Sequence, residues 1–165
     1  MIRCPEPILE NGLLYMIPSP DIKIRNATIH ELDWINQRYN EVEFAHSTFE
    51  REVIAIAEWS TQKAGIGRLV TIGENIFELG GMYVFEPFRE KGIARKIVEF
   101  LLNHTATPST IYCIPFQHLV PFYEHCGFRS CPDFSNVPEE ILDKFDWCAK
   151  KYTTPTSLLI LKKNQ

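Results

Sequence analysis

The sequence predicts one mixed α+β domain built on a mostly antiparallel sheet, and three observations support this prediction. The chain has 165 residues, of which 45% are hydrophobic, enough for a single packed core. Between residues 53 and 84, three strand-like runs are separated by short turns, a pattern typical of an antiparallel meander. From residue 92 onward the pattern changes to helix, strand and helix in order.

The N-terminal third is expected to hold a hairpin, a strand and a helix. Residues 7–17 contain two short apolar runs around an Asn-Gly dipeptide, which suits a type I′ hairpin turn. Residues 22–27 alternate as a strand does, and Thr28 opens a capping-box pattern before apolar residues at helical spacing. Residues 39–52 are weakly periodic and fit either a second helix or a structured loop.

The rest of the chain is expected to alternate between strands and helices. The meander strands are predicted at 53–59, 66–72 and 76–84, with a turn at 62–65. An apolar stripe that begins at Ile93 predicts a helix that ends before Pro108. The later elements are predicted at 109–115 (strand), 119–126 (helix), 138–150 (helix) and 156–162 (strand).

Composition narrows the class of protein. The formal charge is −4, and the basic residues are scattered apart from one cluster at 89–96, so a nucleic-acid-binding face is not expected. The five cysteines form no CxxC pair and no zinc-like spacing, which favours free thiols and no bound metal. The sequence has no leader-like N-terminus and no long apolar run, so we expect a soluble cytoplasmic protein without membrane contact.

The stretch from Phe77 to Leu102 is the most informative part of the chain, because it joins a strand, a turn and a helix without a gap. Within the turn, Arg89-x-x-Gly92-x-Ala94 places two small residues where the backbone can approach a ligand. The helix that follows offers unpaired N–H groups and its positive dipole end to an anion. The alternative explanation is a tight turn with close strand–helix packing and no ligand.

A second motif gives this turn a family context. Residues 122–128 read Phe-Tyr-Glu-His-Cys-Gly-Phe. With the R-x-x-G-x-A turn and the order of elements, this resembles the GNAT superfamily of acetyl-CoA-dependent N-acetyltransferases, whose pyrophosphate loop reads Q/R-x-x-G-x-G/A and whose later helix commonly ends F-Y-x-x-x-G-F. The resemblance covers about residues 22–162. It implies a sheet splayed between its fourth and fifth core strands, with helices on both faces.

The resemblance also implies a domain layout and a cofactor. Residues 1–165 are expected to form a single domain, with the hairpin in 1–20 and a helical insertion in 132–155 as additions to the family core. The implied cofactor is acetyl-CoA, with its pyrophosphate on the turn and its pantetheine arm along the preceding strand. The implied cofactor-binding residues are Met82, Tyr83, Val84, Arg89, Glu90, Lys91, Gly92, Ile93, Ala94 and Arg95.

Acetyl transfer to an amine needs a base for the nitrogen and an acid for the departing thiolate. Glu78 lies on the strand eleven residues before Arg89, where some superfamily members carry a glutamate base, and apolar neighbours could desolvate it. Tyr123 lies where members commonly place a tyrosine that protonates the coenzyme A sulfur. A solvated outward position for Glu78 and a plain core position for Tyr123 remain open. Weaker candidates are Glu43, Glu58, His118 and His125 as bases and Cys113 as a nucleophile.

The expected acceptor is a primary amine of a small molecule or a peptide. Its pocket is predicted within the variable segment 29–52 and the neighbouring strand ends, with Tyr39, Glu43, Phe44 and Arg68 as candidate contacts. A non-catalytic acetyl-CoA sensor is the alternative function, and the absence of G-K-[ST] argues against a nucleotide-binding protein. The sequence leaves open whether the protein is a monomer or a homodimer.

Overall fold

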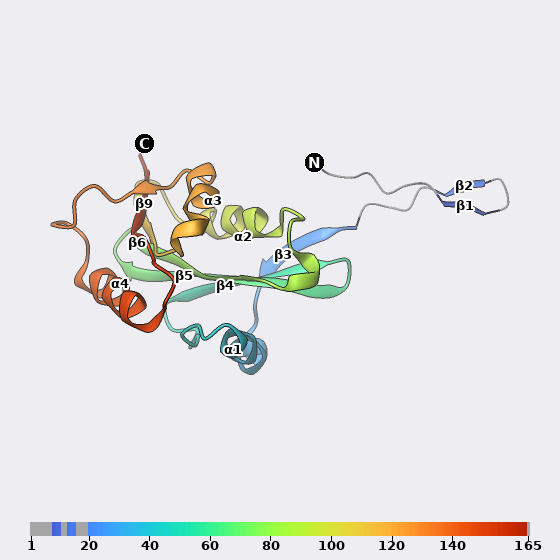
Figure 1. Ribbon diagram of the computed structural model, residues 1–165, viewed down its shortest axis with the longest axis horizontal. Helices are drawn as coiled ribbons and strands as arrows, with labels where there is room; N and C mark the ends of the chain where they lie inside the picture. The colour runs from blue at the N-terminus through green and yellow to red at the C-terminus, as the bar shows by residue number, and fades with distance from the viewer. Residues whose placement is uncertain (1–7, 11–12, 16–19, 165) are drawn as a thin grey trace.

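The computed structural model describes residues 8–10, 13–15 and 20–164. A seven-stranded sheet in the order β3-β4-β5-β6-β7-β9-β8 lies at the centre of the last range (Figure 1). Neighbouring strands are antiparallel except for β6 and β7, which are parallel. The strands are β3 (Ile22–Asn26), β4 (Glu52–Trp59), β5 (Gln62–Gly73), β6 (Ile76–Val84), β7 (Ser109–Cys113), β8 (Arg129–Ser130) and β9 (Leu159–Lys163).

The N-terminal hairpin forms a separate two-stranded sheet. Strand β1 (Ile8–Glu10) pairs antiparallel with β2 (Leu13–Tyr15), which confirms two paired strands within residues 7–17. The Asn-Gly dipeptide on which the turn prediction rests lies outside the described residues.

Helices cover both faces of the large sheet, as expected from the sequence (Figure 1). Apolar side chains of α1 pack with Ile54 and Ile66 on one face. On the opposite face, α2 and α3 pack with Leu69 and Leu79. The alternation of β7 separates the two layers, because Ile111 faces α2 whereas Tyr112 faces α4. The helices are α1 (Leu32–Glu41), α2 (Ile93–Leu102), α3 (Val120–His125) and α4 (Glu139–Lys151).

Two segments differ from the sequence prediction or resolve it. The sequence left open whether residues 39–52 form a helix or a loop. Helix α1 ends at Glu41, and the chain continues as a loop to residue 51. The predicted turn at 62–65 was wrong, because β5 already begins at Gln62 and the chain turns at residues 60–61. A left-handed residue, Ser60 with φ 55°, makes this short turn possible.

The sheet splays between its fourth and fifth core strands, β6 and β7, and this confirms the predicted fold. The parallel pairing joins 76–79 to 110–113 and then stops, while β6 continues to Val84. A register shift follows on the other side of β6, where Gly81 has a positive φ of 58°. The buried Tyr39 hydroxyl donates to the Gly81 carbonyl at 2.9 Å and so fixes this irregular backbone.

Candidate active site

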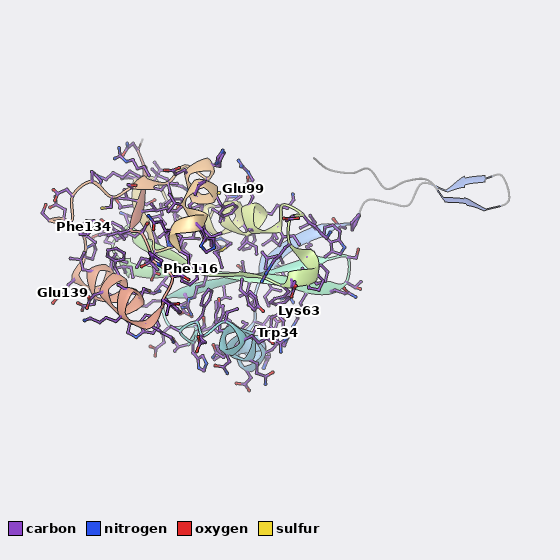
Figure 2. All side chains as sticks on the ribbon, viewed as in Figure 1. Trp34, Lys63, Glu99, Phe116, Phe134 and Glu139 are labelled. Atoms are coloured by element: carbon purple, nitrogen blue, oxygen red, sulfur yellow. The ribbon has the colours of Figure 1, made fainter. Side chains whose placement is uncertain are left out.

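A cavity lies where β6 and β7 separate, and both faces of the sheet contribute to it. It encloses about 90 Å³. Glu78 and Gly80 line it from β6, Cys113 from β7 and Tyr123 from α3. Phe116, from the segment after β7, also lines it (Figure 2). This space is large enough for several waters or one small acyl group.

Glu78 is a buried residue of this cavity rather than a solvated outward one. Its side chain is 5% exposed, and its Oε1 accepts a hydrogen bond from Lys144 Nζ at 2.5 Å. A buried carboxylate needs such a charged partner, since desolvation otherwise penalises its ionised form. The carboxylate proposed as a base from the sequence therefore lies in the cavity and is paired with a lysine.

Tyr123 lies on the same cavity, in contact with the thiol of Cys113. Burial raises the pKa of Tyr123 well above its usual range, and the neighbouring cysteines add to this shift. The hydroxyl therefore keeps its proton at neutral pH, the form that a proton donor requires. Burial likewise raises the pKa of the Cys113 thiol, which makes this cysteine a poor nucleophile.

The turn before α2 has the features of an anion site. Gly92 adopts a left-handed conformation with φ 78°, and a Cβ atom there would meet nothing within 4 Å. No side chain caps α2 and no acidic residue lies in its first turn. The first helical backbone hydrogen bond runs from Lys96 N to Gly92 O, so the amides of residues 93–95 precede it. These N–H groups and the helix dipole fit a pyrophosphate.

The other predicted cofactor residues border this turn. Met82 lines the cavity, whereas the hydroxyl of Tyr83 donates to Glu41 at 3.0 Å. Val84 holds the turn through its carbonyl, which accepts a hydrogen bond from Arg89 Nε at 3.1 Å. The turn backbone also contains Glu90 in a left-handed conformation, with φ 61°.

The four predicted acceptor residues divide into two pairs. Phe44 and Arg68 line the cavity. Tyr39 is fully buried beneath the bulge of β6 and does not line it, and Glu43 contributes a carbonyl that accepts from the Tyr152 hydroxyl at 3.0 Å. Phe44 and Arg68 thus remain direct candidates, while Tyr39 and Glu43 lie where they support neighbouring segments.

Of the weaker candidates for the base, Glu58, His118 and His125 do not line this cavity. Glu58 accepts a hydrogen bond from Arg25 Nε at 2.7 Å, in a partly buried pair between β4 and β3. His118 stacks on Phe116 with ring centroids 6.0 Å apart, and His125 contacts the Pro121 carbonyl at 2.6 Å. Neither histidine is a lining residue of the cavity.

Helix α4 contributes site residues that the sequence reasoning did not identify. Lys144, Trp147 and Cys148 line the cavity from this helix, which begins at Glu139 (Figure 2). A groove of about 560 Å³ between α4 and residues 45–52 shares Glu78, Arg68 and Lys144 with the cavity. No local sequence motif could have linked Lys144 to Glu78, because the two residues are 66 positions apart. The one available signal was that Lys144 lies at helical spacing from the apolar residues of α4.

A comparison with models of protein families indicates the class of protein. Residues 50–130 match the family model described as "Acetyltransferase (GNAT) domain". This range includes β4 to β6, the turn at Gly92 and Tyr123. A search of curated proteins found no match.

Solved structures share the fold at low sequence identity. N-acetylglutamate synthase from Neisseria gonorrhoeae, complexed with coenzyme A and L-arginine, matches with TM-score 0.67 and 13% identity over 87% of this chain. This chain spans about a third of that enzyme, 34% of its length. Rv2747 from Mycobacterium tuberculosis, in complex with coenzyme A, matches with TM-score 0.64 and 17% identity, covering 85% of this chain and 98% of that one. The Escherichia coli ribosomal-protein-S18-alanine N-acetyltransferase gives TM-score 0.63 and 13% identity, covering 88% and 96%.

Residues 50–130 therefore match a GNAT acetyltransferase domain, which confirms the resemblance seen in the sequence. GNAT acetyltransferases use acetyl-CoA, the predicted cofactor, and the N. gonorrhoeae and M. tuberculosis structures named above contain coenzyme A. None of the helices within the described ranges is long and apolar enough to cross a bilayer.

Proposed function

We propose that this domain transfers the acetyl group of acetyl-CoA directly to a primary amine of a small molecule or peptide. One observation carries the proposal: Glu78 and Tyr123, a carboxylate and a protonated hydroxyl, line the same cavity from different elements. Acyl transfer to an amine requires a proton acceptor and a proton donor on the two sides of one carbonyl group. The cavity brings both into one enclosed space.

The site fits the cofactor in two places. The uncapped first turn of α2 would hold the pyrophosphate through the amides of residues 93–95, with Arg89 to Gly92 shaping the approach. Among the described residues, the edge of β6 from Met82 to Val84 has no strand partner on the β7 side, and it would bind the pantetheine arm as an added strand does. When bound there, acetyl-CoA supplies an activated acetyl thioester.

The chain's own residues then perform the proton transfers. Glu78, directly or through a water, accepts the proton that the acceptor nitrogen loses as its bond to the acetyl carbon forms. Tyr123 donates its hydroxyl proton to the sulfur as the carbon–sulfur bond breaks. One proton is taken and one is given, so charge balances over the step. Bulk solvent afterwards restores both residues.

The groove beside α4 is the proposed entrance for the acceptor. It reaches Glu78 and is lined by the carboxylates Glu50, Glu52, Glu140 and Asp143 as well as by Arg51, Arg68 and Lys144. The names of two structural neighbours, an N-acetylglutamate synthase and an S18-alanine N-acetyltransferase, point to amino-group acceptors in those proteins. Amino acids, peptide N-termini and alkyl amines are therefore the acceptors to test first.

The experiment is a coenzyme A release assay with acetyl-CoA and that panel of amines. We expect Glu78→Gln and Tyr123→Phe each to lower kcat by about 10²-fold or more with the best acceptor, because general acid–base catalysis contributes on that order. Each variant should keep the thermal shift that acetyl-CoA gives the parent protein. Unchanged turnover in both variants contradicts the assigned roles. A tight acetyl-CoA shift with no active acceptor supports the sensor alternative instead.

A further inference from the structure

The partner of Glu78 comes from a helix that the sequence marked as an addition to the family core. Lys144 lies on α4, and its side chain is 28% exposed against 5% for Glu78. The contact at 2.5 Å joins residues 66 positions apart. A Cβ atom at Gly80 would lie 3.0 Å from Glu78 Oε1 and 3.9 Å from Lys144 Nζ, so the glycine leaves room for the pair.

The other charged or titratable groups that line the cavity or the groove with Glu78 are Arg68, Cys113, Cys148, Tyr123, Tyr152, Arg51 and the carboxylates Glu50, Glu52, Glu140 and Asp143, and none of them forms an ion pair with Glu78 among the described residues. Arg68 Nη1 donates to the Ala45 carbonyl at 3.0 Å and to Ser47 Oγ at 2.8 Å, and it lies 3.9 Å from Glu52 Oε1. Burial raises the pKa of Cys113 and Cys148, so both thiols are uncharged at neutral pH. Lys144 is therefore the direct counter-charge of Glu78.

From this geometry we propose that Lys144 is a positioning residue that holds the Glu78 carboxylate in the cavity as its counter-charge. The inference rests on the proposed base role of Glu78. A base must be unprotonated to work, and an unpaired buried carboxylate at neutral pH would take up a proton. The hydrogen bond with Lys144 uses Oε1, which leaves Oε2 for the acceptor nitrogen or a water. Helix α4 thus becomes part of the catalytic apparatus.

The docking of α4 explains how Lys144 can be held in register. Ile141 is fully buried against Tyr112 and Ile160 on the sheet. At the start of α4, Glu140 forms an ion pair with Arg51 at 2.9 Å. Arg51 is the last residue of the loop before β4, so this ion pair joins the two sides of the groove. One helical turn separates Ile141 from Lys144, so the burial of Ile141 fixes where along the sheet the Lys144 ammonium group contacts Glu78.

The first test measures stability and needs no acceptor. Lys144→Met leaves the carboxylate buried without its counter-charge, so we expect a lower Tm at pH 7 and a smaller loss at pH 5, where protonation relieves the charge. The double variant Lys144→Met/Glu78→Gln should recover part of the Tm at pH 7. Lys150→Met removes an exposed lysine of the same helix that pairs with Asp146, and it serves as the matched control. A Tm loss in Lys144→Met that is the same at both pH values overturns the proposal.

The second test is the pH dependence of kcat/KM, measured with the best acceptor of the amine panel. Lys144→Met should move the acid limb of the profile to higher pH, the direction expected when a carboxylate loses a neighbouring opposite charge. Lys144→Arg keeps the charge and should restore the parent profile in part. A purely structural role would lower the rate equally at every pH and would not be rescued by arginine.

The outcomes separate this inference from the proposed function. If Glu78→Gln is as active as the parent, the base assignment fails whatever Lys144 does. If Glu78→Gln is inactive but Lys144→Met keeps the parent profile and stability, only the role of Lys144 is wrong. Loss in Glu78→Gln together with a shifted profile in Lys144→Met supports both.

Discussion

Gly92 determines the backbone conformation of the turn that we propose as the pyrophosphate site. Its left-handed φ of 78° lets the chain turn directly into α2 and exposes the first amides of that helix. Open space surrounds the position at which a Cβ atom would lie, so backbone conformation alone, and no steric contact, explains a glycine here.

The conformational role of Gly92 predicts different effects for two substitutions. Gly92→Ala forces an L-residue into the left-handed region at a cost of about 1–2 kcal/mol. We expect this cost to appear in the free energy of unfolding, in the Kd for coenzyme A, or divided between them. Gly92→Asn should lose less, because asparagine tolerates this conformation better. Urea unfolding and calorimetric titration measure the two quantities, and equal losses for alanine and asparagine would contradict the explanation.

At the scale of elements, close contact between α2 and the sheet determines where the turn lies. Gly67 of β5 faces Ile97 of α2, and a Cβ atom there would approach Ile97 Cγ2 to 2.5 Å and Met82 Sδ to 2.6 Å. The helix can therefore approach the strand only because this position lacks a side chain. The same contact places Met82 at the cavity.

Gly67→Ala should therefore destabilise the fold by about 1–3 kcal/mol, the usual cost of overpacking a core. It should also raise the Kd for coenzyme A, since Met82 must shift. Gly73→Ala, in the same strand, is the matched control, because its nearest contact would lie at 3.9 Å. Chemical denaturation of both variants measures the difference. Equal stability of the two would show that α2 does not depend on the gap at Gly67.

At the scale of the whole molecule, burial of protonated side chains determines the response to alkaline pH. Burial raises the pKa of Tyr39, Tyr123 and Cys113. In the unfolded chain a tyrosine loses its proton near pH 10 and a cysteine near pH 8.5, as a rough guide. Above these values the unfolded chain binds fewer protons than the folded one, so the free energy of unfolding falls as pH rises. Below about pH 8 the three groups add no slope.

We therefore expect Tm to fall steeply between about pH 9 and 11. Above the pKa of tyrosine in the unfolded chain, each buried tyrosine lowers the free energy of unfolding by about 1.4 kcal/mol per pH unit. Tyr39→Phe also loses the hydrogen bond to Gly81 and should be less stable at pH 7. Its Tm should nevertheless depend less on pH than that of the parent. Thermal melts across this range test the slope, and an unchanged slope in Tyr39→Phe would show that Tyr39 does not titrate on unfolding.

The sequence by itself determined the features that depend on neighbouring residues. Alternation and turn residues predicted the order of strands and helices. The short turn around Gly92 and the later Phe-Tyr segment predicted where the cofactor binds, because the groups that this prediction needs lie within one strand–turn–helix. The turn at 62–65 was misplaced since Gly65, a typical turn residue, instead allows β5 to lie close to Val84.

Only the tertiary structure decided which side chains meet in the cavity. It buried Glu78, brought Lys144 of α4 to it, and placed Tyr39 beneath the bulge of β6 rather than in the cavity. Such contacts depend on how α4 and α1 dock on the sheet. That docking results from long-range packing of apolar faces, which the spacing of residues along the chain does not encode.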